Sequence, residues 1–302
     1  MKTILRTFVG CTAILFGTAC MGAVKYVPEN MKVELSLKVP GNNAVNYKLH
    51  PDKLENSYFD YEWRSDNKLP ITVFHKVEER DSCMRLTVQL TAAQDVYFNY
   101  RQLLSTGYRH DNCQFYMPGF WYRRNLRSPK KAPSFHTSDS WLVREDRLSA
   151  PLTGIFSEKE KRFMTVNRLD DFSMDALATH KEGEIILSGK TSLGFTGFEN
   201  QQGIAMLSFG FPYREAPKSY IRKLTLAPEV EAFQLMKKGE SVLLTWEIME
   251  SGADDFSDFI QHTWEHCYDT YAPKPVENSY SIADMKQVLS CFFVNSLVDN
   301  QP

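Results

Sequence analysis

The chain has 302 residues, of which 43% are hydrophobic and 13% aromatic, so it can bury a sizeable core. Its 35 basic and 37 acidic side chains give a net charge of -2, which excludes the basic excess typical of nucleic-acid-binding proteins. Beyond the N-terminus, no segment is apolar over the length that a membrane-spanning helix requires.

The N-terminus has the features of an export signal. Positive charges at Lys2 and Arg6 precede a short apolar stretch at 8–16, which is followed by small residues. We therefore expect residues 1–23 to be a signal peptide, and the protein to be exported to the periplasm or the outer membrane. Cys20 half matches a lipoprotein cleavage box and is a candidate lipid anchor. Cleavage by an ordinary signal peptidase is the alternative.

From residue 31 onward, apolar and polar residues alternate, as in strands with one buried face. Charged turns at 157–161 and 237–240 predict two hairpins. Many short strands without intervening amphipathic helices indicate a mainly β fold, a large antiparallel β-sandwich of supersandwich type over residues 24–250. The predicted strands lie near 31–39, 59–63, 71–73, 84–90, 96–100, 154–156, 163–166, 184–188, 204–211, 220–226, 232–236 and 242–248.

Residues 117–151 interrupt this pattern with no sustained period. A connection of this length is usually functional or disordered, and this one is too rich in aromatic residues to stay solvated. We therefore interpret it as an ordered functional loop. Its candidate ligand-binding residues are Trp121, Tyr122, Arg123, His136, Asp139, Trp141, Arg144, Glu145, Asp146 and Arg147.

The residue types in this loop suit a sugar ligand. Aromatic rings can stack on the C–H face of a sugar, and arginine forks can bind carboxylates. Acidic residues could serve in glycoside hydrolysis, although Glu145 and Asp146 are adjacent and cannot form a catalytic pair together. The alternative is that the aromatic residues are core and that the charged residues form a structural ion-pair network.

Two amphipathic helices follow the β region. Apolar residues at helical spacing cover 254–271 and 281–299, and Ser281 with Asp284 forms a capping box. Two helices cannot fully bury each other's apolar faces, so they dock on the β region or begin a helical domain. We favour the second interpretation. Residues 251–302 are then a linker helix and the first helix of a truncated (α/α) barrel, and the chain is the front portion of a larger protein.

The first of these helices contains His262, Glu265 and His266, which fit the H-x-x-E-H pattern of inverted zinc peptidases. No third ligand is identifiable, so a zinc peptidase is only a third hypothesis and we expect no metal. The chain has no P-loop, no GxGxxG and no G-x-S-x-G motif, and we expect no cofactor.

Four cysteines remain outside the signal peptide, and their spacing matches no metal or redox motif. They are Cys83, Cys113, Cys267 and Cys291. One interpretation is that all are buried thiols. The other is a disulfide between Cys83 and Cys113, formed in an oxidising compartment.

Three segments resemble a known family. The runs 116–122 and 134–148, and the helix 259–271 followed by Pro273-Lys274-Pro275, are similar to the N-terminal sandwich and linker of exported bacterial six-hairpin glycosidases. The nearest family is of β-glucuronidase type. This resemblance implies a β-sandwich that precedes an (α/α)6 barrel carrying the catalytic carboxylates. It also implies a carbohydrate substrate that contains uronic acids.

Because only the first barrel helix is present, no catalytic residue can be transferred from this family. We therefore expect the full-length protein to be a glycoside hydrolase, and the 302-residue chain alone to be inactive. The alternative is a non-catalytic carbohydrate-binding or surface-assembly module.

Overall fold

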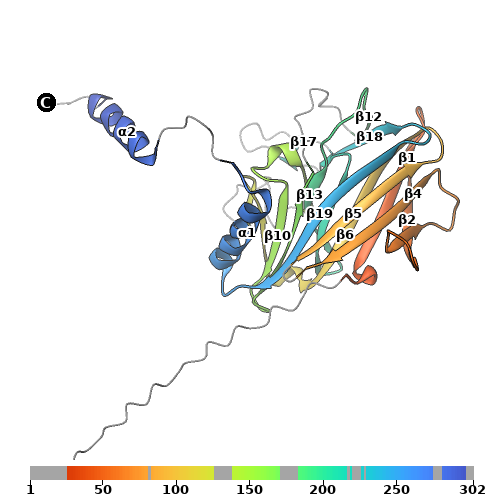
Figure 1. The fold of residues 1–302 in the computed structure, drawn as a ribbon, viewed down its shortest axis with the longest axis horizontal. Helices are drawn as coiled ribbons and strands as arrows, with labels where there is room; N and C mark the ends of the chain where they lie inside the picture. Colours follow the sequence, from red (N-terminus) through yellow and green to blue (C-terminus); the bar gives the residue numbers. More distant parts are fainter. Residues whose placement is uncertain are drawn as a thin grey trace, which may run out of the picture. The chain divides into compact units, whose positions relative to one another are not determined.

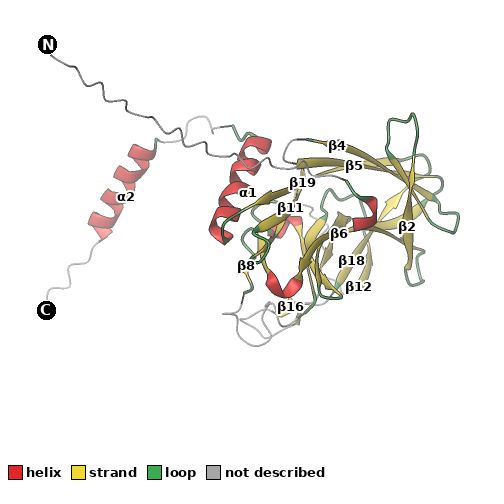
Figure 2. Cartoon of the chain, turned by 90° about the horizontal axis from the view of Figure 1, so that it is seen from below, coloured by secondary structure: helices red, strands yellow, loops and turns green. Residues whose placement is uncertain are grey.

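The computed structural model describes residues 26–80, 83–125, 138–170, 183–215, 218–219, 226–227, 229–274 and 281–296. Within these residues the chain forms 19 strands followed by two α-helices, which confirms the predicted mainly β class (Figure 1). Backbone pairing connects 17 of the strands into one continuous sheet system. This system folds into two layers, with β4, β5 and β19 in one and β6 and β18 in the other (Figure 2).

The first layer has the strand order β2–β1–β6–β14–β13–β9, and every neighbouring pair is antiparallel. Its strands are β1 (Met31–Lys38), β2 (Val45–Lys53), β6 (Val96–Arg109), β9 (Ser140–Arg144), β13 (Phe195–Gln201) and β14 (Ile204–Phe211).

The second layer has the order β2–β3–β4–β5–β19–β11–β10–β7–β8, again antiparallel throughout. β2 therefore belongs to both layers. The other strands are β3 (Tyr61–Arg64), β4 (Ile71–Glu79), β5 (Cys83–Ala92), β7 (Cys113–Met117), β8 (Trp121–Arg123), β10 (Leu152–Ser157), β11 (Arg162–Arg168) and β19 (Ser241–Gly252).

Short elements complete the β region. β18 pairs with β12 in parallel and with β15 and β6 in antiparallel, which adds one parallel pair to the antiparallel sandwich that the sequence predicts. The bounds are β12 (Gly183–Ile186), β15 (Arg214–Glu215), β16 (Lys218–Ser219), β17 (Leu226–Ala227), β18 (Val230–Met236), and the 3-10 turns η1 (Pro28–Asn30), η2 (His110–Asn112) and η3 (Glu145–Arg147).

The core lies between the two layers, because each strand turns its apolar residues inward at every second position. Aromatic pairs cross the interface. The ring centroids of Phe209 and Trp246 are 5.3 Å apart, and those of Phe115 and Phe198 are stacked at 4.0 Å. All four rings are at most 1% exposed. Burial of this much aromatic surface is the main stabilising contribution to a domain of this kind.

Two sequence predictions about the β region need correction. The hairpin at 154–166 forms as predicted, from β10 and β11. The predicted hairpin around 237–240 does not, because β18 pairs with β12, β15 and β6 while β19 pairs with β5 and β11. The segment 117–151 is also not a loop throughout, since it contains β8 and β9. These two strands are short, and three or five residues are too few to show a period.

The helices are α1 (Phe256–Tyr271) and α2 (Ile282–Ser296). The described residues up to Ile260 form one compact unit, and those from Gln261 form another. In the first unit, Phe259 is fully buried with its ring centroid 5.0 Å from that of Phe163. At α2 the predicted capping box forms: Ser281 Oγ accepts from the Asp284 N–H at 3.1 Å, and Asp284 Oδ2 accepts from the Ser281 N–H at 3.2 Å.

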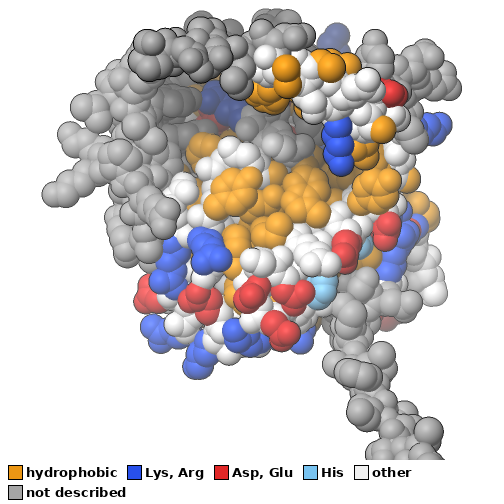
Figure 3. Space-filling view, turned by 90° about the vertical axis from the view of Figure 1, so that its left-hand side faces the viewer, with side chains coloured by type: hydrophobic (Ala, Val, Ile, Leu, Met, Phe, Trp, Pro, Cys, Tyr) orange, Lys and Arg blue, Asp and Glu red, His pale blue; other side chains and the backbone are white. Residues whose placement is uncertain are grey.

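In the second unit, both helices expose large apolar side chains. Figure 3 shows one side of the molecule, with hydrophobic side chains at its centre and acidic and basic side chains along one border. No described helix is long and apolar enough to span a membrane. The exposed side chains are Trp264, Tyr268 and Tyr271 on α1, and Ile282, Met285, Val288, Leu289, Phe292, Phe293 and Val294 on α2.

Candidate functional site

The two tryptophans predicted to stack on a sugar are part of the core. Trp121 is 0% and Trp141 is 3% exposed, and their ring centroids lie 5.1 Å apart. The indole N–H of Trp121 donates to the Arg123 carbonyl oxygen at 2.9 Å. A buried ring has no free face for a ligand, so the structure assigns both rings to packing.

Three other predicted residues lie at the surface, two of them on β8 and one just before β9. Tyr122 is 53% exposed, and Arg123 has its guanidinium 5.2 Å from the ring centroid of Phe256. Asp139 accepts a hydrogen bond from the Asn200 amide at 3.0 Å. The predicted residue His136 lies outside the described residues.

The predicted arginines have carboxylate partners within the protein. Arg144 binds Asp146 through two hydrogen bonds of 3.0 and 2.7 Å, and its guanidinium lies 4.4 Å from the ring centroid of Tyr213. Arg147 Nε lies 2.9 Å from a carboxylate oxygen of Glu215. The bidentate site expected for a ligand carboxylate is therefore occupied by an aspartate of the same turn.

Glu145 is the most buried member of this cluster. It is 1% exposed, and Oε2 accepts from Arg168 at 2.6 Å and from the Gly194 N–H at 2.7 Å. Burial raises the pKa of its carboxyl, although Arg168 and the backbone N–H oppose this shift. A Cβ at Gly194 would lie 2.5 Å from the Gly210 oxygen and 3.0 Å from Glu145, so only glycine fits there. Glu145 is thus a structural anchor.

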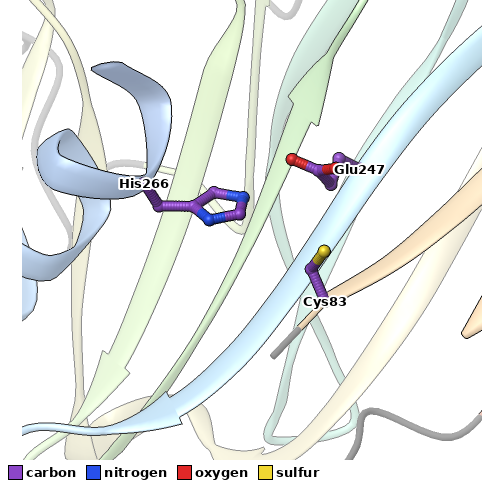
Figure 4. Close-up of side chains that lie close together, drawn as sticks. All are labelled: Cys83, Glu247 and His266. Carbon is purple, nitrogen blue, oxygen red and sulfur yellow. The ribbon is translucent and has the colours of Figure 1, made fainter. Parts of the chain in front are cut away.

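The geometry also bears on the cysteine and zinc-peptidase hypotheses. Cys83 and Cys113 are buried free thiols, so the predicted disulfide is absent from the structure. Cys83 lies beside Glu247 on the neighbouring strands β5 and β19 (Figure 4), and burial raises the pKa of its thiol to about 11. Among the described residues, no group of three potential metal ligands contains both His262 and His266, as the zinc-peptidase pattern would require.

A groove opens where β2 leaves one layer for the other. β2 pairs with β1 only from Val45 to Leu49, where Leu49 is opposite Val33, and its residues 50–53 pair with β3 instead. The first two residues of β1 therefore have no β2 partner. The resulting groove has a volume of about 440 Å³, within the usual range of small-molecule sites.

The groove combines an apolar floor with a charged rim. Its floor includes the buried side chains of Val33, Leu49 and Trp63. Its rim includes Lys32 and Lys48. Other lining residues are Pro28, Glu29, Met31, Glu34, His50, Pro51 and Gln201.

A second open surface is the outer face of β3, β4, β5 and β19. Pairing places Phe74 opposite Gln89 and Gln89 opposite Leu243, so these three side chains share one face. Phe59 stacks on Phe74 at 5.3 Å, and the neighbouring Tyr58 is 70% exposed. A parallel row of hydroxyls lies beside these residues, on Thr72, Thr91 and Ser241.

The sequence did not predict the groove. It predicted strands that form the open face, but not that this face is uncovered. The alternation of β4 and β5 predicts which side chains face outward, but not which outer face stays uncovered. β2 was not predicted as a strand, because Pro51 and the polar residues around it obscure its alternation. The groove depends on β2 changing layers, which has no signal in the sequence.

No protein-family model matches the chain. No curated protein matches it either. Similar solved structures include a polysaccharide lyase with a TM-score of 0.37 and 13% identity, covering 78% of this chain and 27% of the lyase. The Slr1438 protein from Synechocystis sp. PCC 6803 has a TM-score of 0.38 and 6% identity, covering 77% of each chain.

The α-galactosidase from Lactobacillus brevis has a TM-score of 0.28 and 7% identity, covering 74% of this chain and 29% of that enzyme. The chain thus spans 27% and 29% of the lengths of the lyase and the galactosidase. These likenesses are distant, and none supports the β-glucuronidase-type family in particular.

Proposed function

We propose that this chain is the β-sandwich part of an exported carbohydrate-active protein, and that it binds an extended glycan on the open face of β3, β4, β5 and β19. The proposed glycan contains uronic acids. In the complete protein, a helical domain that follows the sandwich would hydrolyse it, and the sandwich would hold the chain for that domain.

The observation that carries this proposal is the composition of the open face. Aromatic rings at Tyr58, Phe59 and Phe74 lie beside a row of hydroxyl and amide groups. Gln89 donates to Thr91 Oγ1 at 3.2 Å, and the Thr91 and Ser241 hydroxyls are 2.8 Å apart. A sugar ring presents C–H groups to an aromatic ring and hydroxyls to such polar groups. A row along a sheet suits several sugar units in succession.

One basic side chain lies beside the aromatic rings of this face. The Lys76 ammonium is 4.2 Å from the ring centroid of Tyr58 and 2.9 Å from a carboxylate oxygen of Glu78. Uronic acid carboxylates that pass the aromatic rings would compete with Glu78 for this ammonium.

Two acids of the predicted loop are engaged in ion pairs, Glu145 with Arg168 and Asp146 with Arg144, and the third, Asp139, would have no partner carboxylate for hydrolysis among them. We therefore propose that the chain alone has no strong glycosidase activity.

A stand-alone binding module is the second candidate. The seven exposed apolar side chains of α2 favour the larger enzyme, because contiguous apolar surface of this kind normally contacts another domain or protein. A lipid anchor at Cys20 fits both candidates and remains a proposal.

Affinity electrophoresis of the 302-residue chain in gels that contain polygalacturonate, alginate, xylan or dextran tests the proposal. We expect retardation by the acidic polysaccharides, and its loss in Tyr58→Ala and Phe74→Ala. Tyr122→Ala is the matched control, since Tyr122 is similarly exposed but lies on β8. Equal mobility of the parent chain with and without every polysaccharide would refute glycan binding. Loss of retardation in Tyr122→Ala alone would move the site to the predicted loop.

A further inference from the structure

We propose that the groove between β1 and β2 is a second binding site, which takes one carboxylate-bearing sugar ring. This inference rests on the proposed function, in that it assumes a carbohydrate ligand. The groove is separate from the open face. It is lined by residues of η1, β1, β2, β3 and β13, and Tyr58, Phe59 and Phe74 are not among them.

The shape of the groove arises from the strand crossing. β1 and β2 are paired as far as Val33 and Leu49, and then β2 turns into the other layer to pair with β3. The gap between them exposes one edge of Met31 and Lys32 that has no β2 partner, although the Met31 N–H donates to the Pro28 carbonyl oxygen. A backbone group that stays unpaired at such an edge can bind a ligand hydroxyl.

The floor of the groove is apolar. Val33 is 1%, Leu49 is 5% and Trp63 is 3% exposed, so each of the three offers only a narrow accessible edge to the groove rather than a free face. The ring of Trp63 is held in place by the buried His75, with ring centroids 5.1 Å apart. An apolar floor beneath polar walls suits the C–H face of a sugar ring better than a fully ionic ligand such as inorganic phosphate.

The rim offers one basic group to an anion. Lys32, Glu34, Lys48 and Glu29 are its charged residues, and Glu34 pairs with Arg101, 3.1 Å away, which also pairs with Glu199. Two ammonium groups therefore balance two carboxylates at the rim. Lys32 donates to Gln201 at 2.6 Å. Among the described residues Lys48 has no ion-pair partner, so its ammonium is available to a ligand carboxylate.

The position of the two lysines supports a shared ligand. Lys48 is opposite Glu34, and Lys32 is two residues from Glu34 on β1, so all three side chains leave the sheet on the same face. Val33 and Leu49 face the opposite side of the sheet, so one ligand can reach both the lysines and the apolar residues only at the open edge of β1, where β2 has turned away. Hydrogen bonds between an ammonium and a carboxylate are among the stronger polar contacts.

Isothermal titration calorimetry with D-glucuronate, D-galacturonate and tri-galacturonate tests this site, with D-glucose and acetate as reference ligands. We expect the parent chain to bind at least one uronate more tightly than either reference. Binding of both monosaccharides and the trimer would indicate a site for any uronate ring, whereas binding of the trimer alone would indicate a site for an oligouronate segment. Acetate binding as tightly as the uronates would overturn the sugar assignment.

Two variants with the same charge change locate the site. Lys48→Ala should weaken uronate binding about tenfold, because it removes a hydrogen bond between charged groups. Lys53→Ala should leave binding unchanged, since Lys53 is on the same strand but outside the groove. Equal affinities of the two variants would overturn the groove site.

The Phe74→Ala chain separates this inference from the proposed function. It should bind uronates as the parent does while losing its retardation by polysaccharide. Retardation by polysaccharide in a parent that binds no uronate would overturn the groove alone. Failure of both measurements would overturn the carbohydrate assignment as well.

Discussion

The cluster around η3 and the groove between β1 and β2 both contain basic and acidic side chains, but they differ in how those charges are partnered. In the cluster, Arg144, Glu145 and Arg147 each contact an oppositely charged residue of the same chain. At the groove, Lys48 is exposed and has no such contact among the described residues. A dense run of charge in a sequence is therefore no evidence of a ligand site until the partners of each charge are known.

Removing Glu145 should give the largest effect, because it takes away the buried carboxylate that lies 2.6 Å from the Arg168 guanidinium, which is itself 4% exposed. We expect Glu145→Ala to lower the free energy of unfolding by about 3–5 kcal/mol, the usual cost of breaking a buried ion pair. Urea denaturation would measure this.

Glu158→Ala is the control for Glu145→Ala, since its ion pair with Arg124 is partly exposed and should contribute about 0–1 kcal/mol. Similar stabilities of the two variants would show that the η3 cluster is not a structural anchor.

A pH series tests a third group of polar residues, which lies in the core behind the groove floor. The nitrogens of His75 are 3.2 Å from the Tyr26 hydroxyl and 2.7 Å from the Tyr100 hydroxyl, and burial lowers its pKa to about 3. The unfolded chain binds this proton near pH 6.5, whereas the folded chain does not until about pH 3. The His75 contribution is thus complete above about pH 6.5 and decreases as the pH falls toward 3.

The free energy of unfolding should therefore decrease by about 1.4 kcal/mol per pH unit from His75 over that range. Urea denaturation at several pH values should show this slope in the parent and in His50→Gln, whose histidine is exposed, but not in His75→Gln. An unchanged slope in His75→Gln would mean that another group titrates.

Replacing Arg147 tests whether the cluster around η3 contributes to glycan binding. Its side chain pairs with that of Glu215, which is only 8% exposed, so Arg147→Ala leaves a buried carboxylate with fewer partners and should cost about 1–3 kcal/mol of stability. It should leave glycan retardation unchanged, while Lys48→Ala leaves stability unchanged and weakens uronate binding. Loss of glycan binding in Arg147→Ala would restore the loop as a binding site.

The smallest effect is expected at the start of α2. Ser281→Ala removes the hydroxyl that accepts from Asp284, at a cost of about 1 kcal/mol. Amide hydrogen exchange in the first turns of α2 should become about fivefold faster, without change in the β region. Unaltered exchange rates would show that the cap does not limit fraying of the helix.

The sequence by itself determined the class of fold and much of the secondary structure. The alternation in β1, β4 and β5 identified their buried faces, because a strand with one face in the core needs an apolar residue at every second position. The change to helical spacing identified α1 and α2, and the Ser281–Asp284 box located the start of α2. Each of these signals depends on neighbours within a few residues.

Only the tertiary structure decided which residues are available to a ligand. Trp121 and Trp141 are as suitable for stacking on a sugar as any exposed ring, but they lie between the two layers. The partners of Glu145 are Arg168 and Gly194, 23 and 49 residues away. The groove arises where β2 changes layers. Burial, ion pairing and strand order depend on contacts between distant residues, and no local pattern specifies them.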